Sequence, residues 1–384
     1  MSIQAPIVIV GTGLSGYSLV RELRKQDKKV PVVLVTADDG TSYSKPMLST
    51  GFTKGKTAGD LAQATASAMA EQLDFDIRTH AVLTGIDTAA HELRIGEERL
   101  AYSKLVLAWG ADVVKLDIPG DAQGRFFSIN DLADYRTFRE ALGGCRRVAV
   151  MGAGLIGCEF ANDLRSGGYE VAVIAPSDNV MPGLLPAVAA DAVRDALTEI
   201  GVEFHLNTVV DRVDRNGEGV MLHLANGDSL TADVVISAVG LKPRTELAQA
   251  AGLDVNHGIC VNRSLETSAP DVYALGDCAE VDGHVLLYVL PLMACARALA
   301  KTLLGTPSEV SYGVMPVMVK TPCCPTTAYP PPVSAVGEWE CQRDGQNVRA
   351  VFRDTEGQIL GFAVTGDYVL EKQALAKQVP PLHA

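Results

Sequence analysis

The sequence lacks the cysteine spacings that mark metal sites and thioredoxin-like redox sites. Its eight cysteines stand at positions 145, 158, 260, 278, 295, 323, 324 and 341, and none forms a C-x-x-C or another zinc-ligand spacing. The adjacent pair Cys323-Cys324 could act in redox chemistry only through a strained disulfide. We therefore expect small, mostly buried thiols and no bound metal.

Long apolar runs and an excess of positive charge are also absent. No run reaches the ~18 apolar residues of a membrane helix, so we expect no membrane insertion. Lys and Arg total 33 against 46 Asp and Glu, a net charge of −13, which argues against nucleic-acid binding. The first six residues hold no basic segment, so we expect no signal peptide and a cytoplasmic protein.

The first motif is a glycine turn behind the apolar run Ile7–Val10. Gly11, Gly13 and Gly16 have the G-x-G-x-x-G spacing of a dinucleotide-binding turn, in which the glycines permit a tight turn, backbone approach to a pyrophosphate and close helix packing. The predicted helix, 14–26, begins with Leu14 and Ser15 and points its positive end at the phosphates. A purely structural turn is the alternative.

A second copy of this pattern favours the nucleotide-binding interpretation. The run 148–151 leads into Gly152, Gly154 and Gly157, with Gly152 standing 141 residues after Gly11. The following helix is expected at 155–166 and carries Ile156 in its first turn. Two such turns predict two dinucleotides bound by one chain.

Further polar residues are expected at the first nucleotide site. An acidic residue roughly 20 positions beyond the glycine turn usually holds a ribose hydroxyl. Asp38 fits that role, and Asp39 is the alternative. A loop carboxylate that simply faces solvent would explain the same residue. Lys45 and Pro46 lie in the polar loop 43–49 and could face the cofactor ring. A surface charge is the alternative for Lys45.

The remaining pattern alternates strands and helices, which predicts an α/β fold. Strands are expected at 30–35, 105–108, 171–174, 202–206 and 271–277, several short strands within 77–95, a hairpin with arms 211–214 and 220–224, and helices at 61–73, 132–142, 187–200 and 292–304. From Thr306 the chain changes character. We expect a small cap there, with strands at 348–353 and 359–364.

Four features together carry a family resemblance: the two glycine turns, the strand 105–111, the strand 271–277 that ends in Gly-Asp, and the loop 43–49. The chain resembles the flavoprotein reductases built like glutathione reductase. The resemblance implies two Rossmann-like three-layer domains and a small α+β cap: an FAD domain at 1–111 and 241–305, an inserted NAD(H) domain at 112–240, and a cap at 306–384. It assigns Asp277 to the ribityl chain of FAD. It also implies cofactor contacts at Val82, Trp109, Gly240 and Lys320.

The cysteine positions narrow the branch of this family. Because the first cysteine is Cys145, the disulfide branch is excluded, and Ser42 and Ser44 stand where the single-cysteine branch needs a cysteine. The branch that passes electrons to a protein iron centre remains. The tracts 42–52, 107–111, 290–297 and 315–322 are similar to those of the rubredoxin–NAD(+) reductases. This similarity implies FAD as the cofactor, NADH as the electron donor and a small acidic rubredoxin as the partner.

This resemblance also implies individual roles and leaves alternatives open. Glu159 matches a family residue near the nicotinamide, although a carboxylate favoured by the helix dipole explains it nearly as well. Lys45, Arg297 and Lys320 are the cations we expect to attract an acidic rubredoxin. A monomer is expected from the short cap. A ferredoxin reductase and a redox-sensing flavoprotein with little turnover remain alternatives.

Three departures from the family pattern stand out. No ribose-binding acid occupies position Ala175 after the second strand of the NAD side, and no Arg stands there for a 2′-phosphate, so the resemblance alone favours NADH over NADPH. Thr50 replaces the Lys that oxygenase-coupled ferredoxin reductases carry after a Leu-Ser dipeptide. Trp109 replaces a small residue at the end of its strand, and simple packing is our interpretation of it.

Overall fold

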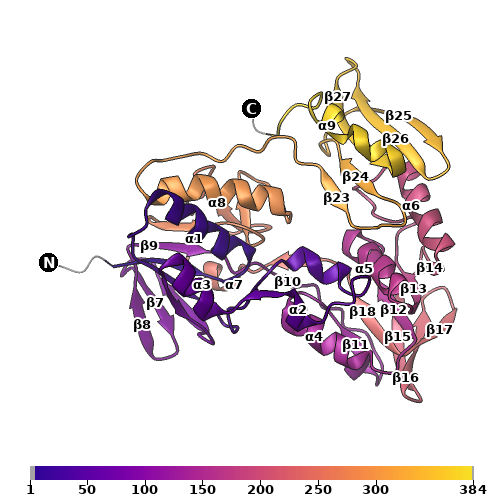
Figure 1. Cartoon of the computed structure of the whole chain (residues 1–384), viewed down its shortest axis with the longest axis horizontal. Coiled ribbons are helices and arrows are strands. Elements are labelled where there is room, and N and C mark those ends of the chain that lie inside the picture. The colour runs from indigo at the N-terminus through magenta and orange to yellow at the C-terminus, as the bar shows by residue number, and fades with distance from the viewer. Residues whose placement is uncertain (1–4, 383–384) are drawn as a thin grey trace.

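The computed structural model describes residues 5–382, and its first layer is a parallel sheet with strand order β21-β9-β1-β2-β5. Strands β1, β2, β9 and β21 are apolar and buried apart from Lys104, as expected for a sheet covered on both faces, whereas the edge strand β5 is polar and only partly buried. Helices α1 and α8 lie side by side against it (Figure 1). The strands are β1 Ile7–Val10, β2 Val32–Val35, β5 Asp76–Arg78, β9 Lys104–Leu107 and β21 Val272–Ala274, and the helices are α1 Leu14–Gln26 and α8 Val289–Leu303.

A second parallel sheet repeats this arrangement with strand order β11-β18-β12-β13-β14. Its elements are β11 Phe126–Phe127, β12 Arg147–Met151, β13 Glu170–Ile174, β14 Val202–His205 and β18 Val234–Ser237, with helices α4 Leu132–Ala141, α5 Leu155–Ser166 and α6 Ala187–Glu199. Each of the two parallel sheets has an antiparallel three-stranded partner. These are β6 Leu83–Asp87, β7 Glu92–Ile95 and β8 Glu98–Ala101 in the first unit, and β15 Val210–Asn216, β16 Gly219–Leu224 and β17 Ser229–Ala232 in the second.

Two antiparallel strands carry the chain between the units. β10 (Ala111–Val113) leaves the first unit and β19 (Leu241–Pro243) returns to it, and the two pair with each other. After the return, β21 adds to the first sheet beside β9. The predicted α/β fold, with the second nucleotide unit inserted into the first, is confirmed by this topology.

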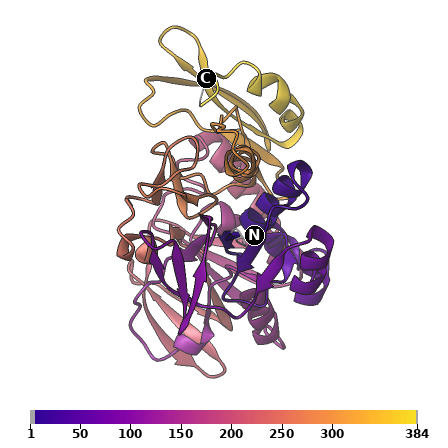
Figure 2. The ribbon, with the colours of Figure 1, turned by 90° about the vertical axis from the view of Figure 1, so that its left-hand side faces the viewer.

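The C-terminal region forms its own antiparallel sheet, β23-β24-β27-β26-β25, at one end of the molecule (Figure 2). Residues 306–316 lead to it without helix or strand. Its elements are β23 Val317–Val319, β24 Thr326–Tyr329, β25 Gly337–Asp344, β26 Asn347–Asp354, β27 Ile359–Thr365, η3 Gly366–Glu371 and α9 Lys372–Ala376. The two predicted strands are β26 and β27. Strand β25 was missed because it is an exposed edge strand with no buried apolar alternation.

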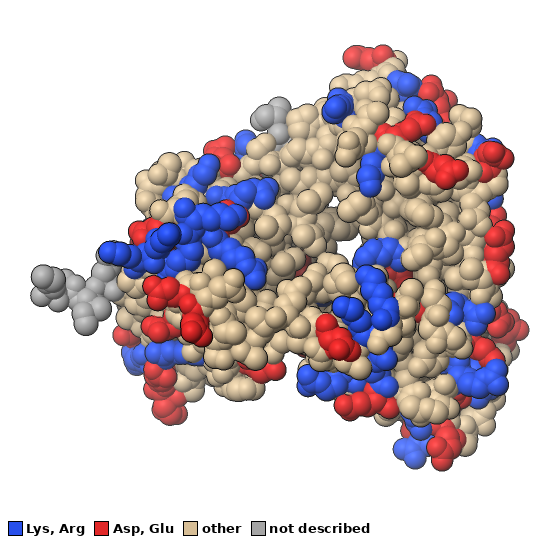
Figure 3. Space-filling view, viewed as in Figure 1, with Lys and Arg blue, Asp and Glu red and all other residues tan. Residues whose placement is uncertain are grey.

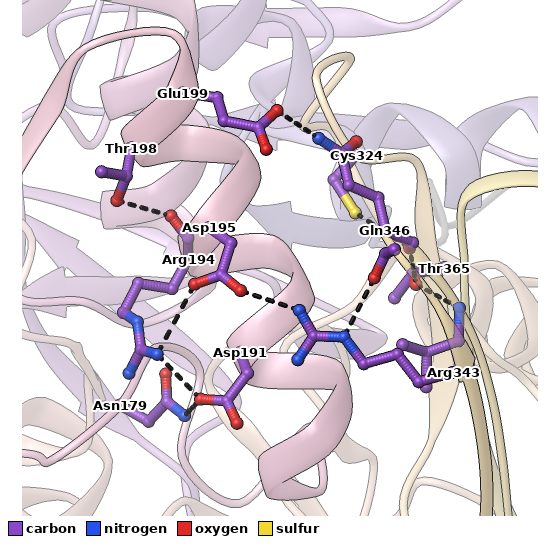
Figure 4. A network of polar contacts seen from close by, with 12 residues as sticks. Asn179, Asp191, Arg194, Asp195, Thr198, Glu199, Cys324, Arg343, Gln346 and Thr365 are labelled. Atoms are coloured by element: carbon purple, nitrogen blue, oxygen red, sulfur yellow. Dashed lines mark hydrogen bonds and ion pairs between the residues drawn. The ribbon is translucent and has the colours of Figure 1, made fainter.

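Polar contacts hold this C-terminal sheet against helix α6 of the second unit (Figure 4). The Arg343 guanidinium lies 2.7 Å from the Asp195 carboxylate, and the Gln346 amide donates to the Glu199 carboxylate at 2.7 Å. Small buried residues of α6, such as Ala189 and Ala192, pack in the same core cluster as the sheet. The C-terminal sheet therefore rests on the second nucleotide unit.

Two helices begin at other residues than predicted. The helix expected at 61–73 begins at Ala66, because the Thr65 hydroxyl caps it by accepting from the Ala68 N–H at 3.2 Å. The helix expected at 292–304 begins at Val289, since Pro291 falls in the first turn, where no N–H is needed. The other elements are β3 Ser42–Tyr43, η1 Lys45–Thr50, α2 Ala58–Leu61, β4 Ala62–Ala64, α3 Ala66–Leu73, η2 Gln123–Arg125, α7 Glu246–Ala250, β20 Ile259–Val261 and β22 Ala279–Val281.

Among residues 5–382, no helix has both the length and the apolar character that crossing a bilayer requires.

Candidate functional site

Both glycine turns open into one cleft between the first nucleotide unit, the second unit and the C-terminal sheet. The cleft encloses about 1560 Å³, which exceeds the ~300–1,000 Å³ of a typical small-ligand pocket. Its wall includes the loop after β1, the loop after β12, the start of α8 and the strand β23. The volume suits two dinucleotides better than one.

Most of the residues expected to bind cofactors line this cleft. They are Gly11, Gly13, Leu14, Ser15, Asp38, Lys45, Pro46, Val82, Trp109, Gly152, Gly154, Ile156, Glu159, Gly240, Asp277 and Lys320. Gly16 and Gly157 are the exceptions, because they lie behind the turns where the helices meet the strands.

The three glycines of each turn meet different surroundings. A Cβ on Gly11 would lie 2.3 Å from the Ala108 carbonyl oxygen, and one on Gly16 would lie 1.9 Å from the Gly11 oxygen, whereas one on Gly13 would meet nothing within 4 Å. The second turn repeats this, with 2.5 Å at Gly152, 1.9 Å at Gly157 and open space at Gly154. Each turn thus has two glycines required by packing and one that borders the open cleft.

No side chain caps the N-terminus of either helix that follows a glycine turn. Gly13 is the N-cap residue of α1 and Gly154 is that of α5, and neither helix has a side-chain hydrogen bond to its cap or an acidic residue in its first turn. The backbone N–H groups and the positive end of each helix dipole are therefore available to a phosphate. This arrangement fits a pyrophosphate at both turns.

Asp38 and Asp39 lie in different environments. The Asp38 carboxylate accepts from the Thr36 hydroxyl at 2.6 Å and from the Gly40 N–H at 2.9 Å, and it lines the cleft. Asp39 is not among the residues that line the cleft, and its carboxylate accepts from the Thr41 N–H at 2.9 Å, which lowers its pKa. The geometry favours Asp38 over Asp39 for a ribose hydroxyl.

Lys45 and Asp277 face each other across the first site. The Lys45 ammonium donates to the Asn130 amide oxygen at 2.7 Å and lies 4.0 Å from the Asp277 carboxylate. Burial lowers the pKa of Lys45 and raises the pKa of Asp277, and the opposite charge of each partly offsets the shift of the other. Sequence reasoning missed Asn130, which stands in no recognisable motif.

Glu159 joins three parts of the chain. Its side chain is fully buried on α5, and its carboxylate accepts from the Ser49 hydroxyl at 2.7 Å and from the Lys320 backbone N–H at 3.0 Å. The Lys320 ammonium forms an ion pair with the same carboxylate. The ammonium facing Glu159 thus comes from Lys320, which directly follows strand β23 of the C-terminal sheet.

Trp109 does more than pack at the junction of the two units. Its indole N–H donates to the Arg244 carbonyl at 2.9 Å, and the Arg244 guanidinium returns a bond to the Trp109 carbonyl at 2.7 Å. Arg244 also pairs with Asp112 at 2.7 Å. Our packing interpretation was therefore incomplete, and Arg244 is a cleft residue that the sequence did not reveal.

The second site has an unusual ribose end. Ala175, Pro176 and Ser177 line the cleft after β13, where this fold commonly places an acidic residue. The Ser177 hydroxyl donates to the Asn179 carbonyl at 2.7 Å. Neutral groups therefore form this part of the wall.

The cysteines stand apart from the cleft. No cysteine is among the described residues that line it, and the eight thiols are free. Burial raises the pKa of Cys323 to about 12 and also raises that of Cys324. This part of the chain therefore offers no thiolate suited to redox exchange.

The three predicted acceptor-docking cations are not brought together on one surface. Lys45 and Lys320 both line the cleft. Lys45 donates to the Asn130 amide oxygen, and Lys320 pairs with the Glu159 carboxylate. Arg297 is exposed on α8. The role of these three cations in attracting an acidic rubredoxin stays a prediction.

Two family models match the chain. Residues 5–300 match the model described as pyridine nucleotide-disulphide oxidoreductase, and residues 309–379 match the rubredoxin binding C-terminal domain. The second match coincides with the separate antiparallel sheet.

Individual proteins show the same likeness. A rubredoxin-NAD(+) reductase of Alcanivorax borkumensis is 52% identical over 378 residues, which cover 98% of this chain and 99% of the relative. Another from Acinetobacter baylyi is 43% identical over 388 residues, covering 98% of each. The ferredoxin reductase for the CYP199A2 system of Rhodopseudomonas palustris superposes with a TM-score of 0.88 at 23% identity, covering 98% and 96% of the two chains, which shows a shared fold.

Proposed function

We propose, since this chain belongs to the pyridine nucleotide-disulphide oxidoreductases and within them to the family of the rubredoxin-NAD(+) reductases, that it transfers electrons from NADH through bound FAD to a rubredoxin. One observation carries the proposal: both glycine turns and the strand β23 of the rubredoxin-binding match line the same cleft. The overall reaction converts one NADH and two oxidised rubredoxins into NAD⁺, one proton and two reduced rubredoxins.

The first site fits FAD. The N-terminus of α1 and the turn at Gly11–Gly13 would hold the pyrophosphate, Asp38 the adenosine ribose, and Asp277 the ribityl hydroxyls. Lys45 would hold its positive charge beside the ring, positioned by Asn130. Bound FAD supplies the conversion of a hydride into single electrons, which nicotinamide alone does not perform.

The second site fits NADH. The N-terminus of α5 would hold its pyrophosphate at Gly154, with Ile156 against the dinucleotide. Glu159 and Lys320 line the cleft near the junction of the three parts, where they would orient the nicotinamide end and exclude water. The relatives are named for NAD(+), which supports NADH despite the neutral ribose end at Ala175.

Electrons would leave without a sulfur relay. The described residues of the cleft include no cysteine, so the wall offers no disulfide for a hydride to reduce. The protein's own contribution is to hold two nucleotides and an acceptor in fixed order.

Several coarser features complete the proposal. The domain bounds are 1–111 with 241–305 for FAD, 112–240 for NAD(H) and 306–384 for the C-terminal cap. The protein acts as a monomer in the cytoplasm and supplies an alkane-oxidation system or another rubredoxin-dependent chain.

Steady-state turnover tests the proposal. The holoprotein is mixed with NADH and purified rubredoxin, ferredoxin or no acceptor, and bleaching of the acceptor is followed. Rapid reduction of rubredoxin alone is the expected result. Preference for ferredoxin would select the alternative reductase, and slow flavin reduction without turnover of any acceptor would select a sensing flavoprotein.

A further inference from the structure

The outer face of helix α8 combines exposed apolar residues with exposed cations. Leu290, Arg297 and Lys301 are spaced by seven and four residues, which places them within about 40° of one another around the helix. Tyr288, Val289 and Leu290 remain 42%, 38% and 49% exposed. We refer to Tyr288, Val289, Leu290, Arg297 and Lys301 as the α8 ridge.

The cations of the α8 ridge are not used to stabilise the fold. Within residues 5–382, neither Arg297 nor Lys301 makes a side-chain hydrogen bond or ion pair, whereas Arg343 and Arg244 are each paired with an aspartate. Basic side chains gather over α1 and α8 on the face shown in Figure 3. Because the whole chain has a net charge of −13, this group of basic side chains is a positive region on a protein that is negative overall.

The apolar end of the α8 ridge reaches the mouth of the cofactor cleft. Tyr288, Val289 and Leu290 line the cleft, and Met318 of β23 lines it as well, with 60% of that residue exposed. The Lys372 ammonium lies 3.6 Å from the Met318 sulfur. These residues make the cleft mouth apolar, with Lys372 beside it on the C-terminal side, while Arg297 and Lys301 lie about 10 and 16 Å further along α8 from Leu290.

We propose that the α8 ridge, together with Met318, is the surface on which a small acidic electron-transfer protein docks. The inference rests on the proposed function and identifies the docking surface on this chain for its rubredoxin. Apolar contact at Leu290 and Met318 brings the partner's redox centre close to the cleft mouth. Arg297 and Lys301 pair with carboxylates at the rim.

Charge complementarity and interface anatomy support this occupant. Protein interfaces combine an apolar centre with a polar rim, and opposite charge accelerates the encounter of the partners. An acidic partner is repelled by most of a chain with excess negative charge, so unpaired cations beside the cleft direct it to the productive face. Lys45 and Lys320 cannot serve this purpose, since both are engaged inside the cleft.

A charge-reversal pair tests the docking surface. The variant Arg297→Glu/Lys301→Glu is compared with Arg94→Glu/Arg136→Glu, which changes the net charge equally at exposed positions on β7 and α4. Reduction of rubredoxin by NADH is measured over a range of salt concentrations, and ferricyanide serves as a small acceptor that needs no docking surface.

We expect kcat/KM for rubredoxin to fall roughly tenfold or more in the α8 variant at low salt, with a flatter salt dependence. The control variant should keep most of its activity, and both should retain FAD and ferricyanide reduction. Equal losses in the two variants, or no loss in either, would overturn the docking surface. A parent dimer that dissociates in the α8 variant would show a second copy as the occupant and would also overturn it.

Failure of the proposed function gives a different result. If the parent protein reduces ferricyanide but no rubredoxin at any salt concentration, the acceptor assignment fails and the docking surface fails with it. If the parent reduces rubredoxin and the α8 variant does so equally well, only the docking surface fails. A Leu290→Ala variant should raise KM for rubredoxin severalfold without altering the salt dependence.

Discussion

The carboxylate of Glu159 is fully buried, yet it receives hydrogen bonds from two segments that lie far from it in the chain. Burial of an unpaired charge costs several kcal/mol, so the Lys320 ammonium and the Ser49 hydroxyl offset the cost of burying this carboxylate. The pair therefore stabilises the junction of three parts of the molecule while it lines the cofactor cleft.

Removal of one partner should expose this dependence. We expect Glu159→Gln to lower the free energy of unfolding by about 1–3 kcal/mol, because the Lys320 ammonium loses its partner in a partly buried place. Combining it with Lys320→Met should recover part of the loss, giving a coupling energy of about 1–2 kcal/mol in a double-mutant cycle. Denaturant unfolding measures all four proteins.

The exposed pair of Arg78 and Glu98 provides the control, since its atoms are accessible and lie 2.6 Å apart. Glu98→Gln should change the unfolding free energy by less than about 1 kcal/mol. Additive effects of the Glu159 and Lys320 substitutions would show that their ion pair contributes nothing.

Asp277 should make stability depend on pH. Burial raises the pKa of Asp277 above its ordinary value in the folded protein. Its contribution to the free energy of unfolding is therefore fully present below the ordinary aspartate pKa, where the carboxyl is protonated. That contribution is lost as pH rises through the folded pKa, because the buried group must then ionise. The flavin-free Asp277→Asn variant should therefore gain stability relative to the parent as pH rises above the ordinary aspartate pKa of about 4. Thermal unfolding of both proteins across this range measures the difference, and a pH-independent difference would contradict it.

At the scale of an element, different glycines of each turn serve helix packing and ligand binding. Gly157 is demanded by packing, because a Cβ there would overlap the Gly152 carbonyl oxygen at 1.9 Å, whereas Gly154 faces open cleft. The backbone of Gly154 has φ −73°, which other residues adopt readily. Fold and ligand binding therefore depend on different glycines of one turn.

Two alanine substitutions should behave oppositely. Gly154→Ala should raise KM for NADH by about tenfold, because its methyl group enters the space beside the phosphates, while FAD content and melting temperature stay unchanged. Gly157→Ala should lower the melting temperature by several degrees, since helix α5 must move away from β12. Ferricyanide kinetics and thermal melts of the two variants test this, and equal behaviour of the two would contradict it.

At the scale of the whole molecule, the C-terminal sheet lies on the second nucleotide unit and contributes Lys320 and Met318 to the cleft. Its contacts with α6 are made within one chain, through Arg343 and Gln346 on one side and small buried residues on the other. The C-terminal sheet and the second nucleotide unit are therefore held together on one side of the cleft.

This arrangement predicts that the cleft is complete in one chain. Sedimentation velocity of the FAD-bound protein should show a single species with the mass of one chain, because every described wall of the cleft is contributed by that chain. Turnover per flavin should not change on dilution. A concentration-dependent species of twice the mass whose dissociation abolishes turnover would contradict the monomer.

The sequence by itself determined the two nucleotide units. Glycine turns act locally: backbone freedom at Gly11 and Gly152 and the apolar runs before them specify strand, turn and helix over a few residues. The bounds 14–26 and 155–166 were accordingly predicted as observed, and Asp38, Asp277 and Lys45 were predicted to reach the cleft they line.

Only the tertiary structure decided which side chains meet. Glu159 pairs with a lysine 161 positions away, Lys45 rests on Asn130, and Trp109 exchanges hydrogen bonds with Arg244. None of these partners stands at a fixed sequence spacing, because each depends on how separately folded sheets pack against one another. The proposed α8 ridge likewise cannot be recognised from the sequence, since it depends on Met318, a residue distant in the chain that lines the same cleft.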